Sequence, residues 1–209
     1  MSSCCRRVER RKDTYKEVSA DYLCLAREPE LGADVRIILE KKMRKIIVVD
    51  AKECMACRTC EIECALAHSE SKELTEVMKK GEPRLNVEGN LEFWAPMMCR
   101  HCEDAPCIKI CPTRAIHRDS PDGPVLLEQE LCVGCNFCLA VCPFGVIGLS
   151  DDGHKVVKCD LCIGRLETGQ IPACVASCPT GALRFVEAEQ YVQEKRSEAL
   201  RRHLEEAPK

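Results

Sequence analysis

The stretch from Cys132 to Pro143 reads C-V-G-C-N-F-C-L-A-V-C-P. Two residues separate each of its first three cysteines, and a fourth cysteine follows after three residues, with a proline directly behind it. A C-x2-C-x2-C loop wraps three thiolates around one cubane iron–sulfur cluster, while the fourth thiolate is directed to a neighbouring cluster. Zinc is the alternative, but zinc prefers pairs of ligands in a single tetrahedral site. The stretch therefore predicts an iron–sulfur cluster.

Similar cysteine spacing recurs along the chain, and 16 of the 19 cysteines fall into four groups of four. The first group has the spacing of the quoted stretch, but Ala65 stands where the proline is expected. The second has a wider loop before its third cysteine, and the fourth has an 11-residue insertion. In order, motif 1 is Cys54, Cys57, Cys60 and Cys64; motif 2 is Cys99, Cys102, Cys107 and Cys111; motif 3 is Cys132, Cys135, Cys138 and Cys142; motif 4 is Cys159, Cys162, Cys174 and Cys178.

Composition supports metal clusters over disulfides. A short secreted protein with many cysteines is expected to form a disulfide framework, but these cysteines lie in tight groups and their number is odd. Aromatic residues make up only 4% of the 209 residues, so cluster ligation is expected to supply part of the order that a large core supplies elsewhere.

Charge and hydropathy exclude several classes of partner. The formal net charge is −3, and four oxidised cubanes with their thiolates would add about −8, which argues against a nucleic-acid partner. The sequence contains no run of 18 apolar residues, so we expect no transmembrane segment. The N-terminus lacks the apolar stretch of a signal peptide, and the expected location is cytoplasmic.

Three regions follow from these patterns. Residues 1–45 form an N-terminal extension, whose Cys4, Cys5 and Cys24 fit no cluster spacing and are expected to hold no cluster. Residues 46–186 contain all four motifs and are expected to form the cluster domain. Residues 187–209 are expected to contain a C-terminal amphipathic helix.

Short strands and turns are expected between the motifs. The β-branched run 46–50 predicts a strand ahead of motif 1. Turn residues at 121–124 and 151–153 predict hairpins within 115–127 and 146–157, and 183–186 reads as a closing strand. Residues 71–80 have helical character. The fold class predicted is α+β.

The order and spacing of the motifs resemble those of a known family over about residues 45–186. The family comprises the four-cluster ferredoxin-like subunits of carbon monoxide dehydrogenase, formate dehydrogenase, formate-linked hydrogenases and dimethyl sulfoxide reductase. The widened motif 2 and the insertion in motif 4 both recur in it. The wording Cys64-Ala-Leu-Ala-His-Ser-Glu-Ser-Lys most resembles the branch associated with carbon monoxide dehydrogenase.

The resemblance implies two bacterial-ferredoxin-like units in one polyferredoxin, in which motif 1 pairs with motif 4 and motif 2 with motif 3. Spacing alone does not distinguish this nested pairing from a sequential one. The resemblance implies four [4Fe-4S] clusters with the following ligands: site A, Cys54, Cys57, Cys60 and Cys178; site B, Cys159, Cys162, Cys174 and Cys64; site C, Cys99, Cys102, Cys107 and Cys142; site D, Cys132, Cys135, Cys138 and Cys111.

The function that the resemblance implies is electron transfer without substrate chemistry. The chain would relay electrons between a catalytic subunit (a carbon monoxide dehydrogenase, formate dehydrogenase, hydrogenase or tungsten or molybdenum enzyme) and a second redox partner. Two alternatives stay open: a free-standing soluble polyferredoxin and a zinc-binding structural protein. We expect no catalytic residues, and none of the five histidines as a ligand. His101, between Cys99 and Cys102, either hydrogen-bonds a cluster or partner or lies in a solvated loop.

Overall fold

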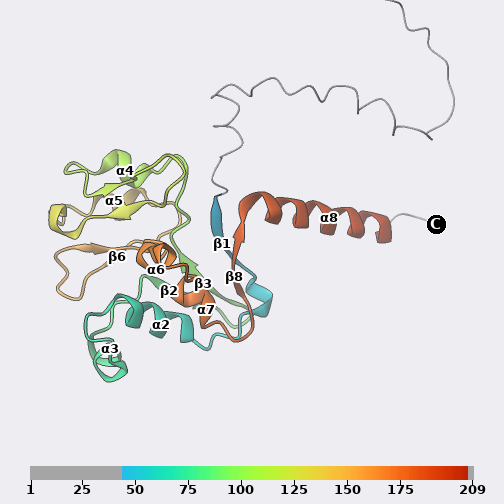
Figure 1. Cartoon of the computed structure of the whole chain (residues 1–209), viewed down its shortest axis with the longest axis horizontal. Helices are drawn as coiled ribbons and strands as arrows, with labels where there is room; N and C mark the ends of the chain where they lie inside the picture. The colour runs from blue at the N-terminus through green and yellow to red at the C-terminus, as the bar shows by residue number, and fades with distance from the viewer. Residues whose placement is uncertain (1–43, 207–209) are drawn as a thin grey trace, which may run out of the picture. The chain divides into compact units, whose positions relative to one another are not determined.

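The computed structural model describes residues 44–206, in which short helices alternate with four two-stranded antiparallel sheets (Figure 1). This mixture agrees with the α+β prediction, and these residues belong to one compact unit. The N-terminal extension up to residue 43, with Cys4, Cys5 and Cys24, lies outside the described residues. Within the described part, no helix is long and apolar enough to cross a membrane.

The first and last strands of this region pair with each other. β1 (Lys45–Val49) runs antiparallel to β8 (Leu183–Glu187), in a register from Lys45↔Glu187 to Val49↔Leu183. Strand β1 is the predicted β-branched run, and η2 (Ala51–Glu53) follows it directly. Motif 1 follows β1 and motif 4 precedes β8, so this pairing brings the first and last motifs together.

The two predicted hairpins are confirmed. β4 (Ile116–His117) pairs with β5 (Leu126–Leu127), and β6 (Gly148–Leu149) pairs with β7 (Val156–Val157). The short 3-10 helix η3 (Gln129–Leu131) then connects β5 to motif 3. Each hairpin therefore spaces two consecutive motifs along the chain.

A third hairpin fills the long connection between motifs 1 and 2. α3 (Leu74–Lys80) lies within the segment of predicted helical character, and β2 (Leu85–Gly89) and β3 (Trp94–Met98) follow it. The sequence analysis did not anticipate these two strands. Alternate residues of β2 and the last residue of β3 are buried in the core, namely Leu85, Val87 and Met98.

Proline decides where the motif helices end. α4 (Pro106–Ile110), α5 (Phe137–Val141) and α7 (Ala173–Ala176) all stop shortly before a cysteine that proline follows. The residue before a proline is driven out of the helical region, and proline itself cannot continue a helix. In motif 1 alanine replaces proline, and α2 (Thr59–His68) continues for another turn beyond Cys64.

The C-terminal helix is also confirmed, as α8 (Ala188–Glu206). Arg184 of β8 contacts the first turns of this helix. Its guanidinium pairs with Glu194 at 3.4 Å and lies 5.9 Å from the ring centre of Tyr191. A further short helix, α6 (Ile163–Glu167), lies in the insertion of motif 4.

Two separate cores hold the cysteine motifs. The first core packs cysteines of motifs 1 and 4 with residues of β2, β3 and β8, and its buried members are Cys60, Cys64, Leu85, Val87, Met98, Cys174 and Leu183. The second core packs cysteines of motifs 2 and 3 with residues of the hairpins, and its buried members are Ala105, Cys107, Ile116, Val125, Cys138, Ile147 and Val156.

Candidate iron–sulfur cluster sites

The third cysteine has the same place in all four motifs. It is the second residue of a helix and it is buried; these cysteines are Cys60 in α2, Cys107 in α4, Cys138 in α5 and Cys174 in α7. Burial disfavours a thiolate, and burial raises the pKa of Cys60 to about 11 and that of Cys174 further still. Four buried thiols that must ionise to act as ligands therefore require a compensating cation, which a metal centre supplies.

A left-handed backbone residue precedes the second cysteine of every motif. Its φ is 57° at Ala56, 46° at His101, 68° at Gly134 and 63° at Leu161. Only one of the four is glycine, although this region of backbone space disfavours other residues. Such strain collects at functional sites, where the surrounding structure fixes it. The repetition shows one loop geometry built four times from different residues.

The loops turn backbone N–H groups toward the cysteine sulfurs. The N–H of His101 donates to Cys99 Sγ at 3.4 Å, and that of Leu161 donates to Cys159 Sγ at the same distance. The N–H of Arg84 donates to Cys64 Sγ at 3.3 Å. Turns of this kind form nests of N–H groups that bind anions, iron–sulfur clusters among them. The residues present therefore fit an anionic cluster.

His101 supplies a further test of that fit. Only 6% of its surface is exposed, so the solvated-loop alternative is wrong. Its Nδ1 accepts the N–H of Val125 at 3.0 Å, which places the ring proton on Nε2. Nε2 is buried and has no partner among the described residues. Burial lowers the pKa of His101 to about 3, with help from the charge of Lys158, so the ring stays neutral and offers one donor.

Two cavities of the second core mix the cysteines of motifs 2 and 3. One cavity is lined by all four cysteines of predicted site C: Cys99, Cys102, Cys107 and Cys142. The other is lined by all four cysteines of predicted site D: Cys111, Cys132, Cys135 and Cys138. In each cavity, three cysteines come from one motif and the fourth comes from the other.

The cysteines of motifs 1 and 4 also lie together. Cys60, Cys64 and Cys174 share the first core, and Cys54 and Cys178 pack against it. Burial raises the pKa of Cys174 most, and the next largest effects are the charges of the neighbouring Cys159, Cys64 and Cys162. These are its companions in predicted site B.

Two of the fourth cysteines, Cys111 and Cys178, lie in a different environment. Burial is the largest single effect and raises the pKa of both, but several hydrogen bonds together outweigh burial and lower the pKa below its ordinary value. The donors are backbone N–H groups and a threonine two residues on, Thr113 and Thr180. The turn that follows each of these two cysteines therefore stabilises its thiolate form.

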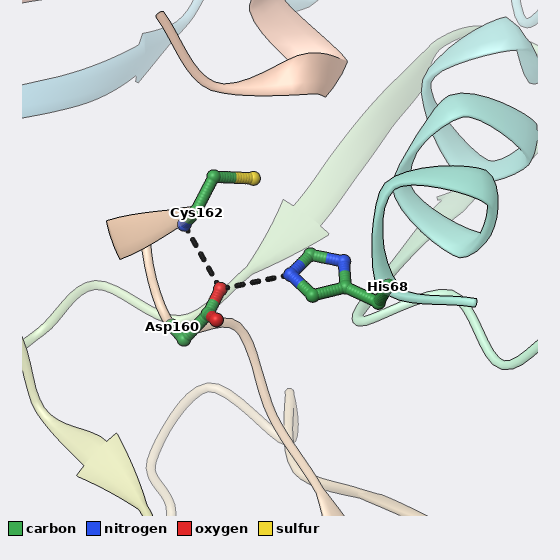
Figure 2. Close-up of side chains that lie close together, drawn as sticks. All are labelled: His68, Asp160 and Cys162. Atoms are coloured by element: carbon green, nitrogen blue, oxygen red, sulfur yellow. Dashed lines mark hydrogen bonds and ion pairs between the residues drawn. The ribbon is translucent and has the colours of Figure 1, made fainter. Parts of the chain in front are cut away.

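A polar network that the sequence analysis missed joins motif 1 to motif 4 (Figure 2). Asp160 Oδ1 accepts the N–H of Cys162 at 2.9 Å and His68 Nε2 at 3.0 Å, and its other oxygen pairs with Arg84 at 2.7 Å. His68 Nδ1 lies 2.7 Å from the carbonyl oxygen of Cys64. The available signals were the four-residue step from Cys64 to His68 and the position of Asp160 inside a C-x-x-C loop.

This network carries a fixed positive charge. Both nitrogens of His68 face acceptors, so both donate and the ring is a cation. Burial is the largest single effect and lowers its pKa, but the hydrogen bonds to Asp160, Cys162 and Cys64 together outweigh burial and raise the pKa to about 11. The same partners hold the pKa of Asp160 well below its usual range, against burial. The atoms of His68, Asp160 and Cys162 are close enough for a metal ion, but Arg84 already occupies the carboxylate.

Known proteins are similar to this chain in sequence. A family model for the 4Fe-4S dicluster domain matches residues 91–188. The electron transport protein HydN of Escherichia coli (strain K12) is 38% identical over 173 residues, which cover 74% of this chain and 96% of the relative. An iron-sulfur protein of Rhodospirillum rubrum is 38% identical over 168 residues, covering 72% and 86%.

A third relative is named as part of an enzyme. The thiosulfate reductase electron transfer subunit PhsB of Salmonella typhi is 36% identical over 144 residues, covering 67% of this chain and 74% of the relative. The cysteine loops and these relatives lead to one conclusion. The chain belongs to the family of ferredoxin-like iron–sulfur electron-transport proteins that contain the 4Fe-4S dicluster domain.

Proposed function

We propose that the chain holds four [4Fe-4S] clusters at sites A to D and relays electrons between a catalytic oxidoreductase subunit and a second redox protein. The observation that carries the proposal is the pair of cysteine-lined cavities, each with three cysteines from one motif and one from another. That arrangement supports the nested pairing, because a sequential arrangement would line each cavity with a single motif. The core shared by motifs 1 and 4 supports the same pairing for sites A and B.

The exposure of the cysteines suggests the two ends of the relay. Among the sixteen motif cysteines only Cys57 and Cys135 are exposed, one in motif 1 and one in motif 3. Exposed apolar side chains lie beside both in the sequence, Met55 near Cys57 and Val133 and Phe137 near Cys135. Apolar residues around an exposed ligand suit a small, transient contact with a redox partner. Sites A and D would therefore be the terminal sites of the relay.

The chain itself supplies ligands and environment, not substrate chemistry. Every motif has four cysteines, so each predicted cluster is fully ligated and no iron is left open to a substrate. When bound, each cluster exchanges one electron at a time, and the surrounding protein sets its potential. The cytoplasm suits this function, because its reducing conditions keep thiols free.

The catalytic partner that we propose is an oxidoreductase of the class served by the related subunits. Thiosulfate reductase is the enzyme named for one relative. The sequence resemblance adds carbon monoxide dehydrogenase, formate dehydrogenase, hydrogenase and tungsten or molybdenum enzymes as candidates, with the first favoured by the sequence after Cys64. Purification of the native chain with its companion would identify the partner.

Metal content tests the number of clusters. We expect anaerobic reconstitution to give about sixteen iron atoms and as many acid-labile sulfides per chain. A variant with serine at Cys4, Cys5 and Cys24 is the matched control, and it should bind the same amount. About eight irons in a chain with all its cysteines intact would contradict the four-cluster proposal, and zinc in place of iron would contradict the proposed function itself.

A further inference from the structure

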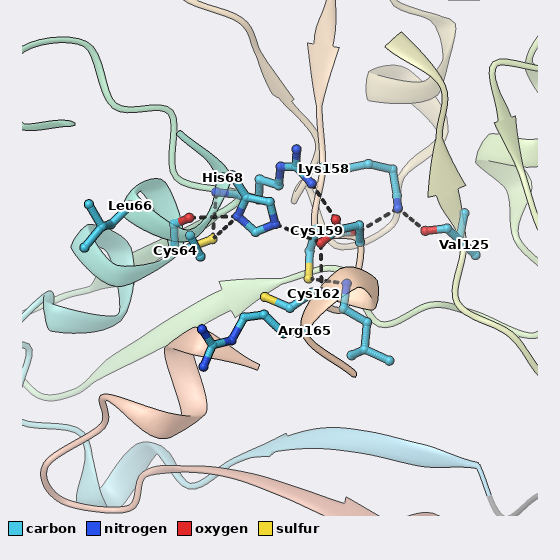
Figure 3. A network of polar contacts seen from close by, with 12 residues as sticks. Cys64, Leu66, His68, Val125, Lys158, Cys159, Cys162 and Arg165 are labelled. Atoms are coloured by element: carbon cyan, nitrogen blue, oxygen red, sulfur yellow. Dashed lines mark hydrogen bonds and ion pairs between the residues drawn. The ribbon is translucent and has the colours of Figure 1, made fainter. Parts of the chain in front are cut away.

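Lys158 is a buried basic side chain next to a predicted cluster ligand. It follows β7 and directly precedes Cys159, and only 2% of its surface is exposed. Its Nζ donates to the carbonyl oxygen of Cys159 at 2.7 Å and to that of Val125 (Figure 3). The two carbonyl oxygens satisfy two of the three N–H groups of the ammonium, but they do not neutralise its charge.

No carboxylate of the described residues neutralises it either. The ion pairs between residues 44 and 206 do not include Lys158. The nearest acid in the sequence, Asp160, is already paired with Arg84 and His68. A buried charge without a partner is unfavourable, so proteins pair such charges or place them beside a metal centre.

The two acceptors of Lys158 identify where the missing negative charge lies. Cys159 is the first cysteine of motif 4, and Val125 lines the cavity formed by the four cysteines of site C. The ammonium thus contacts a predicted ligand of site B, Cys159, and a residue that lines the cavity of site C, Val125. A cluster bound to four thiolates is anionic, so clusters at sites B and C would each supply negative charge near Lys158.

We propose that Lys158 is the internal counter-cation of the clusters at sites B and C and that its charge raises the reduction potential of both. The inference rests on the proposed function. An added electron makes a cluster more negative, and a fixed positive charge in a low-dielectric interior stabilises that reduced form. Sites B and C lie where the relay passes from one core to the other. Lys158 would thereby lower the energy of the electron at that crossing.

Two substitutions separate the charge of Lys158 from its shape. Lys158→Met removes the charge and keeps a chain of similar length, whereas Lys158→Arg keeps the charge. The matched control is Lys109→Met in α4, which removes the same charge from a side chain that is 67% exposed and paired with Asp104, both residues lying between cysteines of motif 2. Solvent screens such a surface charge, so it should have little effect on a buried cluster.

The measurement is a potentiometric titration of the reconstituted full chain, followed by electron paramagnetic resonance after iron and sulfide have been counted. We expect Lys158→Met to keep its iron and to shift two clusters to lower potential. At a fixed potential their oxidised-to-reduced ratio should rise about tenfold, which is about 59 mV for a one-electron couple. Lys158→Arg and Lys109→Met should titrate like the wild type.

Unchanged potentials in Lys158→Met would overturn the inference, and so would an equal shift in Lys109→Met. If Lys158→Met fails to load, Lys158→Gln takes its place in the same titration. Equal loss of iron from the Met, Gln and Arg variants would assign Lys158 a purely packing role and overturn the inference as well. A wild-type chain without cubane signals would overturn the proposed function, and the inference with it. Loaded clusters with unshifted potentials would overturn the inference alone.

Discussion

Gly134 shows at the scale of one residue how the cluster loops are constrained. It occupies the left-handed position of motif 3, which Ala56, His101 and Leu161 occupy in the other motifs. A left-handed conformation costs a residue with a Cβ roughly 1–2 kcal/mol. The three other loops tolerate that cost, so strain alone does not explain why motif 3 has glycine. The close approach of the His154 carbonyl explains the glycine of motif 3, because a Cβ on Gly134 would lie 2.1 Å from the carbonyl oxygen.

We therefore predict that Gly134→Ala destabilises the protein more than strain alone requires. The matched control is Gly145→Ala, where φ is +60° but no atom lies within 4 Å of the added Cβ. The control should lower the free energy of unfolding by about 1 kcal/mol. Gly134→Ala should lower it by about 2 kcal/mol more, because the backbone of the β6–β7 turn must move. Urea midpoints of the reconstituted variants measure the difference, and equal midpoints would contradict the assignment of a clash.

At the scale of elements, helix length follows from what stands after the fourth cysteine. Three motif helices end before a Cys-Pro step, while α2 runs on through Ala65 to His68. The additional turn places the His68 ring against Asp160 and so ties motif 1 to motif 4. One alanine thus gives motif 1 a contact that its three counterparts do not make through their own helices.

The change Ala65→Pro should remove that contact. Proline has no N–H to donate within α2 and collides with the preceding turn, which costs about 3 kcal/mol or more in a helix interior. We expect a lower urea midpoint and loss of the His68 to Asp160 bond. In a nuclear magnetic resonance titration of the reconstituted chain the pKa of His68 should be lower in the variant than in the wild type, because that bond is one of the contacts that raise it. Ala65→Gly is the control, since it costs about 1 kcal/mol and keeps the N–H. A proline variant as stable as the glycine variant would contradict this account.

Elements with local signals were predictable from the sequence, and elements without them were not. The hairpins β4–β5 and β6–β7 were predicted because turn residues lie between their strands. The β2–β3 hairpin was missed because Pro96 stands inside β3, and proline argues against a strand. In a two-stranded sheet both strands are edges, where proline is tolerated. Among the site residues, regular spacing identified the cysteines, whereas Lys158 and Asp160 required knowledge of the folded contacts.

At the scale of the whole molecule, the nested order of the motifs has a measurable consequence. Cys178 belongs to motif 4 by sequence, but it packs against the same core as Cys54, and it is predicted to complete site A. Pro179 turns the chain away directly after it. The thiolate of Cys178 is therefore expected to serve the cluster held by Cys54, Cys57 and Cys60.

The variant Cys178→Ala should damage site A and leave the ligands of site B intact. Site A should lose one iron or take up an exogenous ligand, with some general loss of stability because cluster binding and folding are coupled. Site-resolved Mössbauer or electron paramagnetic resonance spectroscopy distinguishes the two clusters. Cys111→Ala is the parallel variant in the second core, where site D should be affected. Damage at the site of Cys159, Cys162 and Cys174 after the Cys178 change would show that each motif serves its own cluster.

The pairing of β1 with β8 also sets an order of events during synthesis. The ribosome releases Lys45 long before Glu187, so β1 waits for its partner until nearly all of the described chain has emerged. The hairpin between motifs 2 and 3 has both strands available much earlier. The second core is thus free to form first, and the first core forms only when β8, the last strand to be synthesised, has emerged. A nascent chain interrupted before Leu183 would expose an unpaired β1 edge, open to aggregation or to recognition by a chaperone.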